Sequence, residues 1–190
     1  MKIAVVGTGN IGDALGTRWR AAGHDVVFGS RAGTGNGPGG ATVTTVREAL
    51  GAADVVVLAV PGGAVAEIAA ANSAALAGKV VVDATNRMGE PEMNSRSAIM
   101  AAVPDARYVR AFNSLGWENF AEPPAGAALF FAADPTARAV AEELISSVGL
   151  EPVFAGDAAQ SSTVDALAPL WFALVRHNDG NRRVALGIVR

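Results

Sequence analysis

The feature that most constrains the fold is a glycine-rich turn near the start of the chain. An apolar run at residues 3–6 leads into Gly-Thr-Gly-Asn-Ile-Gly at residues 7–12, and a helical pattern continues to residue 22. One face of that helix carries apolar residues at a spacing of four, namely Ile11, Leu15 and Trp19. A strand, a G-x-G-x-x-G turn and a helix in this order are typical of dinucleotide-binding α/β proteins. The opening of the chain therefore predicts a Rossmann-type fold.

Each glycine of the turn has a separate physical role in this prediction. Gly7 permits the tight turn, Gly9 lets the backbone approach a pyrophosphate, and Gly12 lets the helix pack closely on the strand. The free amides at the start of the helix then face the pyrophosphate. We expect the whole turn to bind the cofactor through Gly7, Thr8, Gly9, Asn10, Ile11 and Gly12.

Strand-like and helical patterns alternate along the rest of the chain. Further strands are predicted at 26–28, 54–60, 80–82, 108–112, 129–132 and 152–154. Further helices are predicted from 44 or 45 to 50, and at 62–71, 95–103, 135–148, 163–175 and 181–189. This alternation predicts a doubly wound, mainly parallel sheet covered on both faces. We expect one NADP-binding α/β domain over residues 1–190, with a short helical C-terminal extension over about 160–190 that shapes a second-substrate cleft.

Composition excludes several other classes of protein. The chain has 190 residues, no cysteine and a net charge of −3. These numbers argue against a disulfide framework, a thiolate metal site and a nucleic-acid-binding surface. Its two histidines, His24 and His177, are far apart in the sequence, so no metal site is expected. No apolar stretch approaches the ~20 residues that a membrane span needs. We therefore expect a soluble cytoplasmic protein without a metal, a nucleic acid or a membrane partner.

The end of the second predicted strand indicates the preferred cofactor. NAD-binding proteins usually carry Asp or Glu there, whereas this chain has Gly29, Ser30 and Arg31. A carboxylate would repel the 2′-phosphate of NADP, and a guanidinium pairs with it in a forked geometry. The hydroxyls of Ser30 and Thr8 can add donors. The sequence therefore predicts a preference for NADP(H), with a solvated loop position for Arg31 as the alternative.

Polar residues follow other predicted strands at the edge where ligands bind in such sheets. Val60 and Pro61 end one strand, and Asn86 follows another. After the strand that ends at Phe112, Asn113 and Ser114 are suited to orienting a carboxamide or a substrate carbonyl. For Asn86 and Asn113, hydrogen bonding to a turn backbone is an equally good interpretation. His177 could orient a ligand too, although an interaction with the end of its own helix is favoured.

General acids and bases are scarce near these strand ends. His24 precedes the second strand and so belongs to the opposite edge of the sheet, and the only tyrosine, Tyr108, is not followed by a lysine four residues later. A carbonyl reductase needs a proton donor for the new alkoxide. Direct hydride exchange between two cofactors does not need a proton donor from the protein, because the cofactor rings themselves supply the electronic stabilisation. No residue is therefore predicted to be an acid–base catalyst.

Several segments, in order, resemble the NADP-dependent coenzyme F420 reductases. They are MKIAVVGTGNIGDAL, VVFGSR, VVLAVP, VVDATN and RAFNSLGW, spread over roughly the first 120 residues. The resemblance implies that Thr8, Ser30 and Arg31 hold the 2′-phosphate, and that Val60 and Pro61 line the dinucleotide with the glycine-rich turn. It also implies coenzyme F420 as the second substrate, with its deazaflavin ring stacked on the nicotinamide. The chain departs from the family in having no basic residue at positions 32–46 and in its short second half.

The last fifteen residues carry an excess of positive charge. Arg176, Arg182, Arg183 and Arg190 stand against Asp179 alone. This segment could attract the anionic tail of coenzyme F420, and a solvated helix face is the alternative. Trp171 and Phe172, on a strongly apolar helix, belong either to the core or to a homodimer seam near the cleft, as the resemblance suggests.

Two other functions remain compatible with the residues. One is an NADPH-dependent reductase of a small imine, carbonyl or alkene without a deazaflavin, which the scarcity of acids disfavours and the short second half favours. The other is a non-catalytic NADP-binding sensor or partner-binding module, which predicts tight cofactor binding without turnover.

Overall fold

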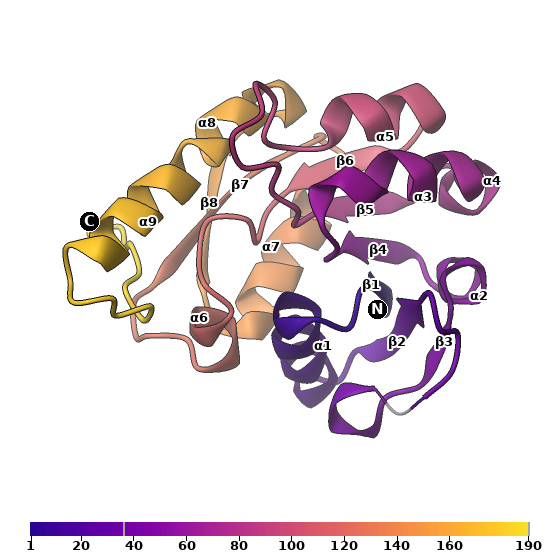
Figure 1. Cartoon of the computed structure of the whole chain (residues 1–190), viewed down its shortest axis with the longest axis horizontal. Helices are drawn as coiled ribbons and strands as arrows, with labels where there is room; N and C mark the ends of the chain where they lie inside the picture. The colour runs from indigo at the N-terminus through magenta and orange to yellow at the C-terminus, as the bar shows by residue number, and fades with distance from the viewer. Residues whose placement is uncertain (36, 190) are drawn as a thin grey trace.

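The computed structural model describes residues 1–35 and 37–189, and Figure 1 shows their arrangement. An eight-stranded sheet runs through the molecule in the order β3-β2-β1-β4-β5-β6-β7-β8. Its strands are β1 (Lys2–Val6), β2 (Asp25–Ser30), β3 (Val43–Thr45), β4 (Val55–Leu58), β5 (Val80–Asp83), β6 (Arg107–Arg110), β7 (Ala128–Ala133) and β8 (Glu151–Gly156). All neighbours are parallel except β6 and β7. The first six strands have the order of a doubly wound dinucleotide-binding sheet, so the predicted fold class is confirmed.

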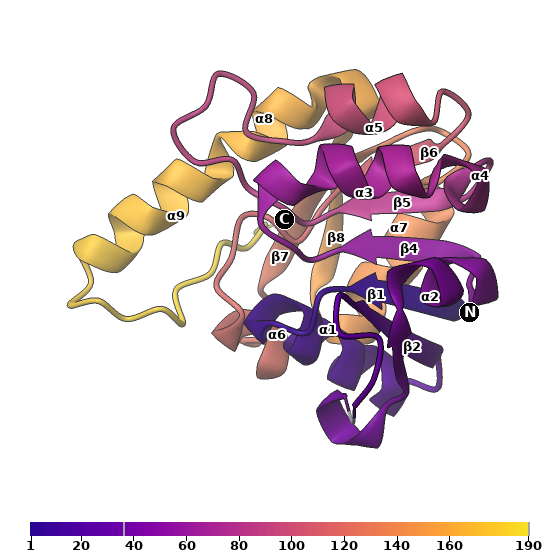
Figure 2. The same ribbon diagram turned by 45° about the vertical axis from the view of Figure 1, so that its right-hand side comes forward.

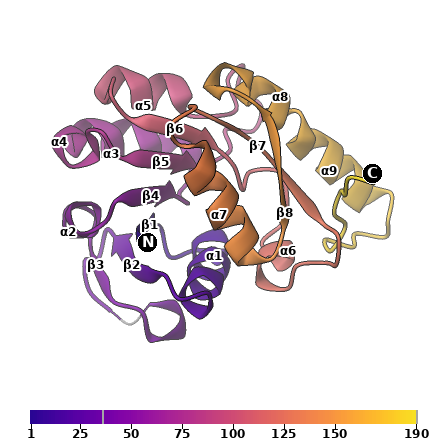
Figure 3. The ribbon, with the colours of Figure 1, turned by 180° about the vertical axis from the view of Figure 1, so that it is seen from behind.

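Helices connect the strands and cover the sheet. They are α1 (Asn10–Ala21), α2 (Val46–Ala52), α3 (Val65–Ala71), α4 (Ser73–Leu76), α5 (Arg96–Ala102), α6 (Glu118–Ala121), α7 (Arg138–Val148), α8 (Ser161–Asp165) and α9 (Leu167–Arg176). Short 3-10 turns are η1 (Pro38–Gly40), η2 (Gly62–Ala64) and η3 (Ala158–Gln160). Figure 2 shows α3 and α5 on the near face of the sheet, and Figure 3 shows α7 in front of the opposite face.

The alternation of side chains along β1 explains the two layers. Ile3 and Val5 belong to a core cluster that includes residues of α1, α7 and α9. Ala4 and Val6 belong to a second cluster, with residues of α2, α3 and α5. Because successive side chains of a strand point to opposite faces, an unbroken apolar run is what a strand buried on both faces requires.

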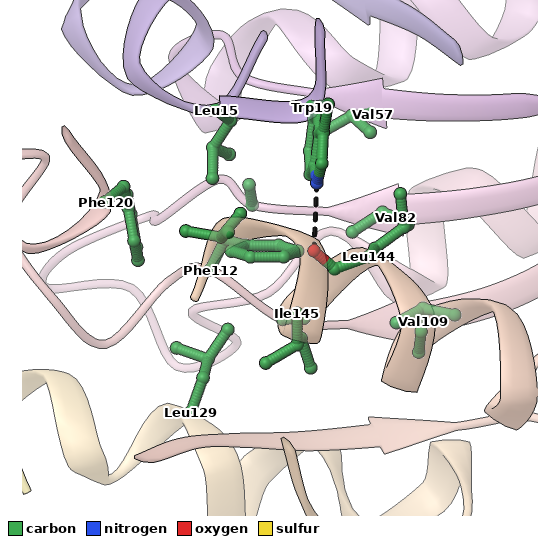
Figure 4. Close-up of a cluster of buried hydrophobic side chains, with 14 of the residues drawn as sticks. Leu15, Trp19, Val57, Val82, Val109, Phe112, Phe120, Leu129, Leu144 and Ile145 are labelled. Atoms are coloured by element: carbon green, nitrogen blue, oxygen red, sulfur yellow. Dashed lines mark hydrogen bonds between the residues drawn. The ribbon is translucent and has the colours of Figure 1, made fainter. Parts of the chain in front are cut away.

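An aromatic contact joins α1 to the second half of the chain. Trp19 is fully buried, and its indole Nε1 donates to the carbonyl of Leu144 in α7 at 2.9 Å (Figure 4). The ring of Phe112 packs edge-on against Trp19, with centroids 5.6 Å apart, and edge-on against Phe120 of α6, at 5.7 Å. These contacts hold the segment after β6 against the dinucleotide-binding half.

Two of the predicted elements differ from the structure. The helix predicted over 163–175 is divided into α8 and α9 at Ala166. The helix predicted over 181–189 is wrong. The carbonyls of residues 182, 184 and 186 accept hydrogen bonds from Asn119 Nδ2, Trp171 Nε1 and the Ala128 amide instead of from a helical turn. Strand β3 was not predicted, whereas the helix predicted from 44 or 45 to 50 agrees with α2, whose start Thr45 caps through reciprocal hydrogen bonds with Glu48.

Gly16 tests how tightly α1 packs on β2. A Cβ at Gly16 would lie 2.3 Å from the ring of the fully buried Phe28. We expect Gly16→Ala to lower the free energy of unfolding by about 1–3 kcal/mol, because an overpacked core must shift. In α2, a Cβ at Gly51 would meet no atom of residues 1–35 and 37–189 within 4 Å. Gly51→Ala, as the matched control, should raise stability by about 0.5–1 kcal/mol in urea unfolding; equal effects of the two changes would contradict this packing.

Candidate functional site

Two cavities lie where the parallel strands end. The first, of about 530 Å³, is lined by the glycine-rich turn, the end of β2 and the segment after β4. The second, of about 370 Å³, is lined by the same turn and by residues that follow β4, β5 and β6. In Figure 2 the arrowheads of β4 and β5 point toward the side on which α9 lies. The structure thus brings most of the predicted site residues to one edge of the sheet, as expected for this fold.

The glycine-rich turn has the geometry that the sequence predicted. Gly7 has a φ of 113°, and a Cβ there would lie 2.3 Å from the carbonyl oxygen of Ala59. A Cβ at Gly12 would lie 2.2 Å from the carbonyl oxygen of Gly7. At Gly9 a Cβ would meet nothing within 4 Å among the described residues, and none of their side chains caps the helix that starts beside it. Glycine is therefore required for packing at two positions, and at the third it leaves an open cradle before helix amides.

Ser30 and Arg31 border a further hollow of about 700 Å³ together with Thr8. The hydroxyl of Ser30 accepts from the Gly33 amide at 3.2 Å, so its hydrogen is still free to donate. Arg31 is exposed and makes no ion pair or hydrogen bond within residues 1–35 and 37–189. Asp13 lines the same hollow, and its negative charge disfavours the binding of an anion there. The site thus offers one unengaged guanidinium and nearby hydroxyls.

The glycine-rich loop beyond Arg31 is attached to α1. The guanidinium of Arg20 donates to the carbonyls of Pro38 at 3.3 Å and Gly39 at 2.5 Å. The glycine-rich sequence of residues 31–40 is typical of a flexible loop, and its position 36 lies outside the described residues. The described part therefore has a defined contact with α1.

The second cavity collects the residues that follow several strands. The predicted residues Asn10, Ile11, Val60, Pro61, Asn86 and Asn113 line it. The same cavity is also lined by Trp117, Trp171, Phe172 and Arg182, which were not predicted as cofactor-binding residues. Ser114 is buried outside the lining, and His177 is exposed at the end of α9, away from the cavity. The structure therefore does not bring His177 to the cleft.

Asn86 and Asn113, which sequence reasoning could not tell apart, differ sharply. Asn86 Nδ2 donates to the backbone carbonyl of Asn113 at 2.7 Å, and its Oδ1 accepts from Arg110 at 2.9 Å. Asn113 is 4% exposed, and neither atom of its carboxamide has a hydrogen-bond partner among the described residues. Asn86 is thus engaged within the protein, whereas Asn113 keeps a free donor and a free acceptor.

Arg110 is the residue of this region that sequence reasoning missed. It is fully buried in β6 and lies 3.4 Å from a carboxylate oxygen of Asp83 and 2.6 Å from one of Asp165 in α8. It also donates to the carbonyl of Thr85 at 2.5 Å. A buried charge needs such partners. The only signal in the sequence was a pair of opposite charges in neighbouring apolar strands, at Arg110 and Asp83.

The positive charge of the C-terminal segment is balanced by residues from elsewhere. Arg182 pairs with Glu118 at 2.6 Å and lies over the ring of Trp171, 5.0 Å from its centroid. Arg183 pairs with the exposed Glu122 away from the cavity. The predicted Arg190 lies outside the described residues. Among the described arginines of this segment, Arg182 is the one that lines the second cavity.

The two aromatic residues of α9 have different surroundings. Trp171 is 2% exposed and donates from its indole nitrogen to the carbonyl of Val184 at 2.7 Å, so it belongs to the core. Phe172 is 37% exposed. A homodimer seam at Phe172 stays a prediction.

Comparisons with known proteins agree with this geometry. Residues 2–87 match the family described as NADP oxidoreductase, coenzyme F420-dependent. A solved structure from Arthrobacter sp. FB24, described as an F420-dependent NADP reductase, is 25% identical, with a TM-score of 0.84 over 100% of both chains. Residues 2–87, the dinucleotide-binding part of the chain, match this family, and the chain is an NADP-dependent oxidoreductase.

Two other proteins are similar over most of the chain. A hypothetical protein of Sinorhizobium meliloti is 31% identical, with a TM-score of 0.73 over 85% of this chain and 87% of that one. Rat metalloreductase STEAP3 is 28% identical over 184 residues, which are 90% of this chain. The chain spans 38% of the length of that curated relative. Within the described residues, none of the helices has the length and apolar character that crossing a bilayer requires.

The titration of Tyr108 tests whether the polar cluster of Tyr108, Asp83 and Arg110 is buried. Its hydroxyl donates to Asp83 at 2.9 Å, and burial first, then the charge of Asp83, raises the pKa of Tyr108 well above its ordinary value. Because Tyr108 is the only tyrosine, the alkaline absorbance change of tyrosinate belongs to it alone. We expect no tyrosinate in the folded protein at pH 10–11, and its abrupt appearance on unfolding.

The same shift sets a pH dependence of stability. The folded pKa lies above the unfolded value of about 10, so this contribution is complete below pH 10 and is lost as the pH rises further. A smooth titration of the folded protein near pH 10 would contradict the buried hydrogen bond.

Proposed function

We propose that this protein transfers a hydride between NADP(H) and the deazaflavin coenzyme F420. The observation that carries the proposal is that the two cavities share a wall. Gly9, Ala59, Val60 and Pro61 line both of them. A dinucleotide whose adenosine half occupies the first cavity can pass over Gly9 and place its nicotinamide in the second. The deazaflavin ring then occupies the rest of the second cavity.

The chain's residues fit an NADP dinucleotide. The open cradle at Gly9 accepts the pyrophosphate in front of the α1 amides. Arg31, with no partner among the described residues, pairs with the 2′-phosphate, and the hydroxyls of Ser30 and Thr8 donate to it. Val60 and Pro61 lie beside the dinucleotide where the cavities meet. The proposed cofactor residues are thus those predicted from the turn and the strand ends.

The chemical character of the second cavity favours a hydride partner that needs no proton donor. Its lining within the described residues contains no histidine, lysine, tyrosine, aspartate or glutamate. When bound, NADPH would supply the hydride, which adds to a ring carbon of the deazaflavin, and the negative charge left on the ring would be delocalised or take a proton from solvent, without a side-chain acid. The protein's part is to hold the two rings together and keep water out, with Trp117 and Phe172 providing flat apolar surface.

A spectrophotometric assay tests the proposal. Purified protein is mixed with NADPH and oxidised coenzyme F420 near neutral pH, with NADH as the control. We expect the deazaflavin absorbance to bleach with NADPH and to change little with NADH. Protein that binds NADPH and leaves the deazaflavin unchanged would contradict the proposal, and would favour the reductase of a small imine, carbonyl or alkene. Binding without hydride loss to any acceptor would favour the sensor.

Arg182 and Arg183 form a matched pair within this assay. Arg182 lines the second cavity and Arg183 does not, although both pair with a glutamate. We expect Arg182→Gln to raise the KM for coenzyme F420 about tenfold, since a charge-assisted contact contributes about 1.5–3 kcal/mol. Arg183→Gln should leave that KM unchanged. Equal effects of the two variants would mean that the anionic tail binds elsewhere.

Arg31 tests the cofactor preference. We expect Arg31→Ala to raise the Kd for NADPH about 10–100-fold, because an ionic hydrogen bond of about 1.5–3 kcal/mol is lost. The Kd for NADH, which has no 2′-phosphate, should stay the same. Calorimetric titration of both nucleotides gives the comparison, and an equal loss for both would show that Arg31 does not discriminate between them.

A further inference from the structure

The carboxamide of Asn113 is an unusual group within the second cavity's wall. Asn113 is only 4% exposed, and it lines the cavity. Its Nδ2 and Oδ1 lack a hydrogen-bond partner within residues 1–35 and 37–189. A buried amide that is left unpaired costs the protein stability. A side chain with this cost is expected where a ligand supplies the missing hydrogen bonds.

The backbone before Asn113 is held in a strained conformation. Phe112 has a φ of 62°, which bulky residues other than glycine rarely adopt. The edge-on contacts of its ring with Trp19 and Phe120 hold it there. Strain of this kind persists only where the surrounding packing enforces it, and it is concentrated at ligand sites.

A relay of hydrogen bonds, which runs from Arg110 through Asn86 to the Asn113 carbonyl, also fixes this segment. Arg110 donates to Asn86 Oδ1, so the amide nitrogen of Asn86 must point to the Asn113 carbonyl, 2.7 Å away. The buried pairs of Arg110 with Asp83 and Asp165 hold the guanidinium in place. The backbone of Asn113 is thus held by aromatic packing and by this relay, while its side chain is the part without a partner.

We propose that Asn113 recognises the amide group of a ring bound in the second cavity. Its carboxamide offers an NH₂ group that donates and a carbonyl oxygen that accepts, and these complement a ligand amide that has both kinds of group. The proposal rests on the proposed function, which places two reacting rings in that cavity. Two sources carry this chemistry: the carboxamide of the nicotinamide and the ring amide of the deazaflavin. Asn86 is a positioning residue, because both ends of its side chain are used within the protein.

The test compares Asn113→Leu with Asn86→Leu, since leucine keeps the shape of asparagine and removes its polar atoms. Three quantities are measured: the thermal midpoint of the protein without ligand, the Kd for NADPH and for 2′-phospho-ADP-ribose, and the KM for coenzyme F420. The second nucleotide keeps the 2′-phosphate and pyrophosphate and has no nicotinamide.

We expect Asn113→Leu to leave the thermal midpoint unchanged or higher, and to weaken the ligand that carries the amide about tenfold. If the nicotinamide is the partner, the Kd for NADPH rises while that for 2′-phospho-ADP-ribose stays constant. If the deazaflavin is the partner, the KM for coenzyme F420 rises and both Kd values stay constant. Asn86→Leu should lower the thermal midpoint, because it removes the hydrogen bonds that Asn86 accepts from Arg110 and donates to the Asn113 carbonyl.

Two outcomes overturn the proposal: a lowered midpoint for Asn113→Leu with unchanged ligand constants, or an equal loss for both nucleotides. The proposed function fails separately, if the wild-type protein does not reduce coenzyme F420. In that case the comparison of the two nucleotides still decides whether Asn113 recognises the nicotinamide, and unchanged Kd values then count against the inference.

Discussion

The buried guanidinium of Arg110 connects the two halves of the molecule. It lies in β6, the last strand of the parallel run from β3 to β6, between Asp83 at the end of β5 and Asp165 in α8. Removing one member of such a buried group leaves an uncompensated charge, which typically costs about 3–5 kcal/mol. The ion pair with Asp165 attaches α8, and α9 follows it directly in the chain. The position of Trp171 and Phe172 of α9 at the second cavity therefore depends on the buried ion pair between Arg110 in the sheet and Asp165.

The same residue also joins the core to the cleft. Arg110 contacts the Thr85 carbonyl and the Asn86 side chain, and both residues line the second cavity. Aromatic packing around Phe112 acts on the next residues of the chain. In the proposed reaction, the rate comes from holding two rings in contact, and a rigid support of this kind is what such catalysis requires. The described lining of the second cavity contains no acid–base side chain, which agrees with a reaction that depends on positioning the two rings.

The sequence predicted the parts of the fold that depend on local patterns. The G-x-G-x-x-G turn, the alternation of apolar runs with helices and the Ser30-Arg31 pair all concern neighbours in the chain, and the family match over residues 2–87 agrees with them. What it could not predict depends on partners far along the chain. The segment 181–189 has a helical pattern, but distant donors bind its carbonyls. Asn86 and Asn113 look alike in the sequence, and only the position of Arg110 distinguishes them.

The central claim is direct hydride transfer between two bound rings, and isotope labelling tests it most directly. NADPH carrying deuterium at the transferable position of the nicotinamide is incubated with the protein and oxidised coenzyme F420 in ordinary water. The mass of the reduced deazaflavin is then measured. Our account predicts that the deuterium is recovered in the deazaflavin, without loss to solvent. Deuterium that stays on the nicotinamide, or that appears in the water, would contradict it.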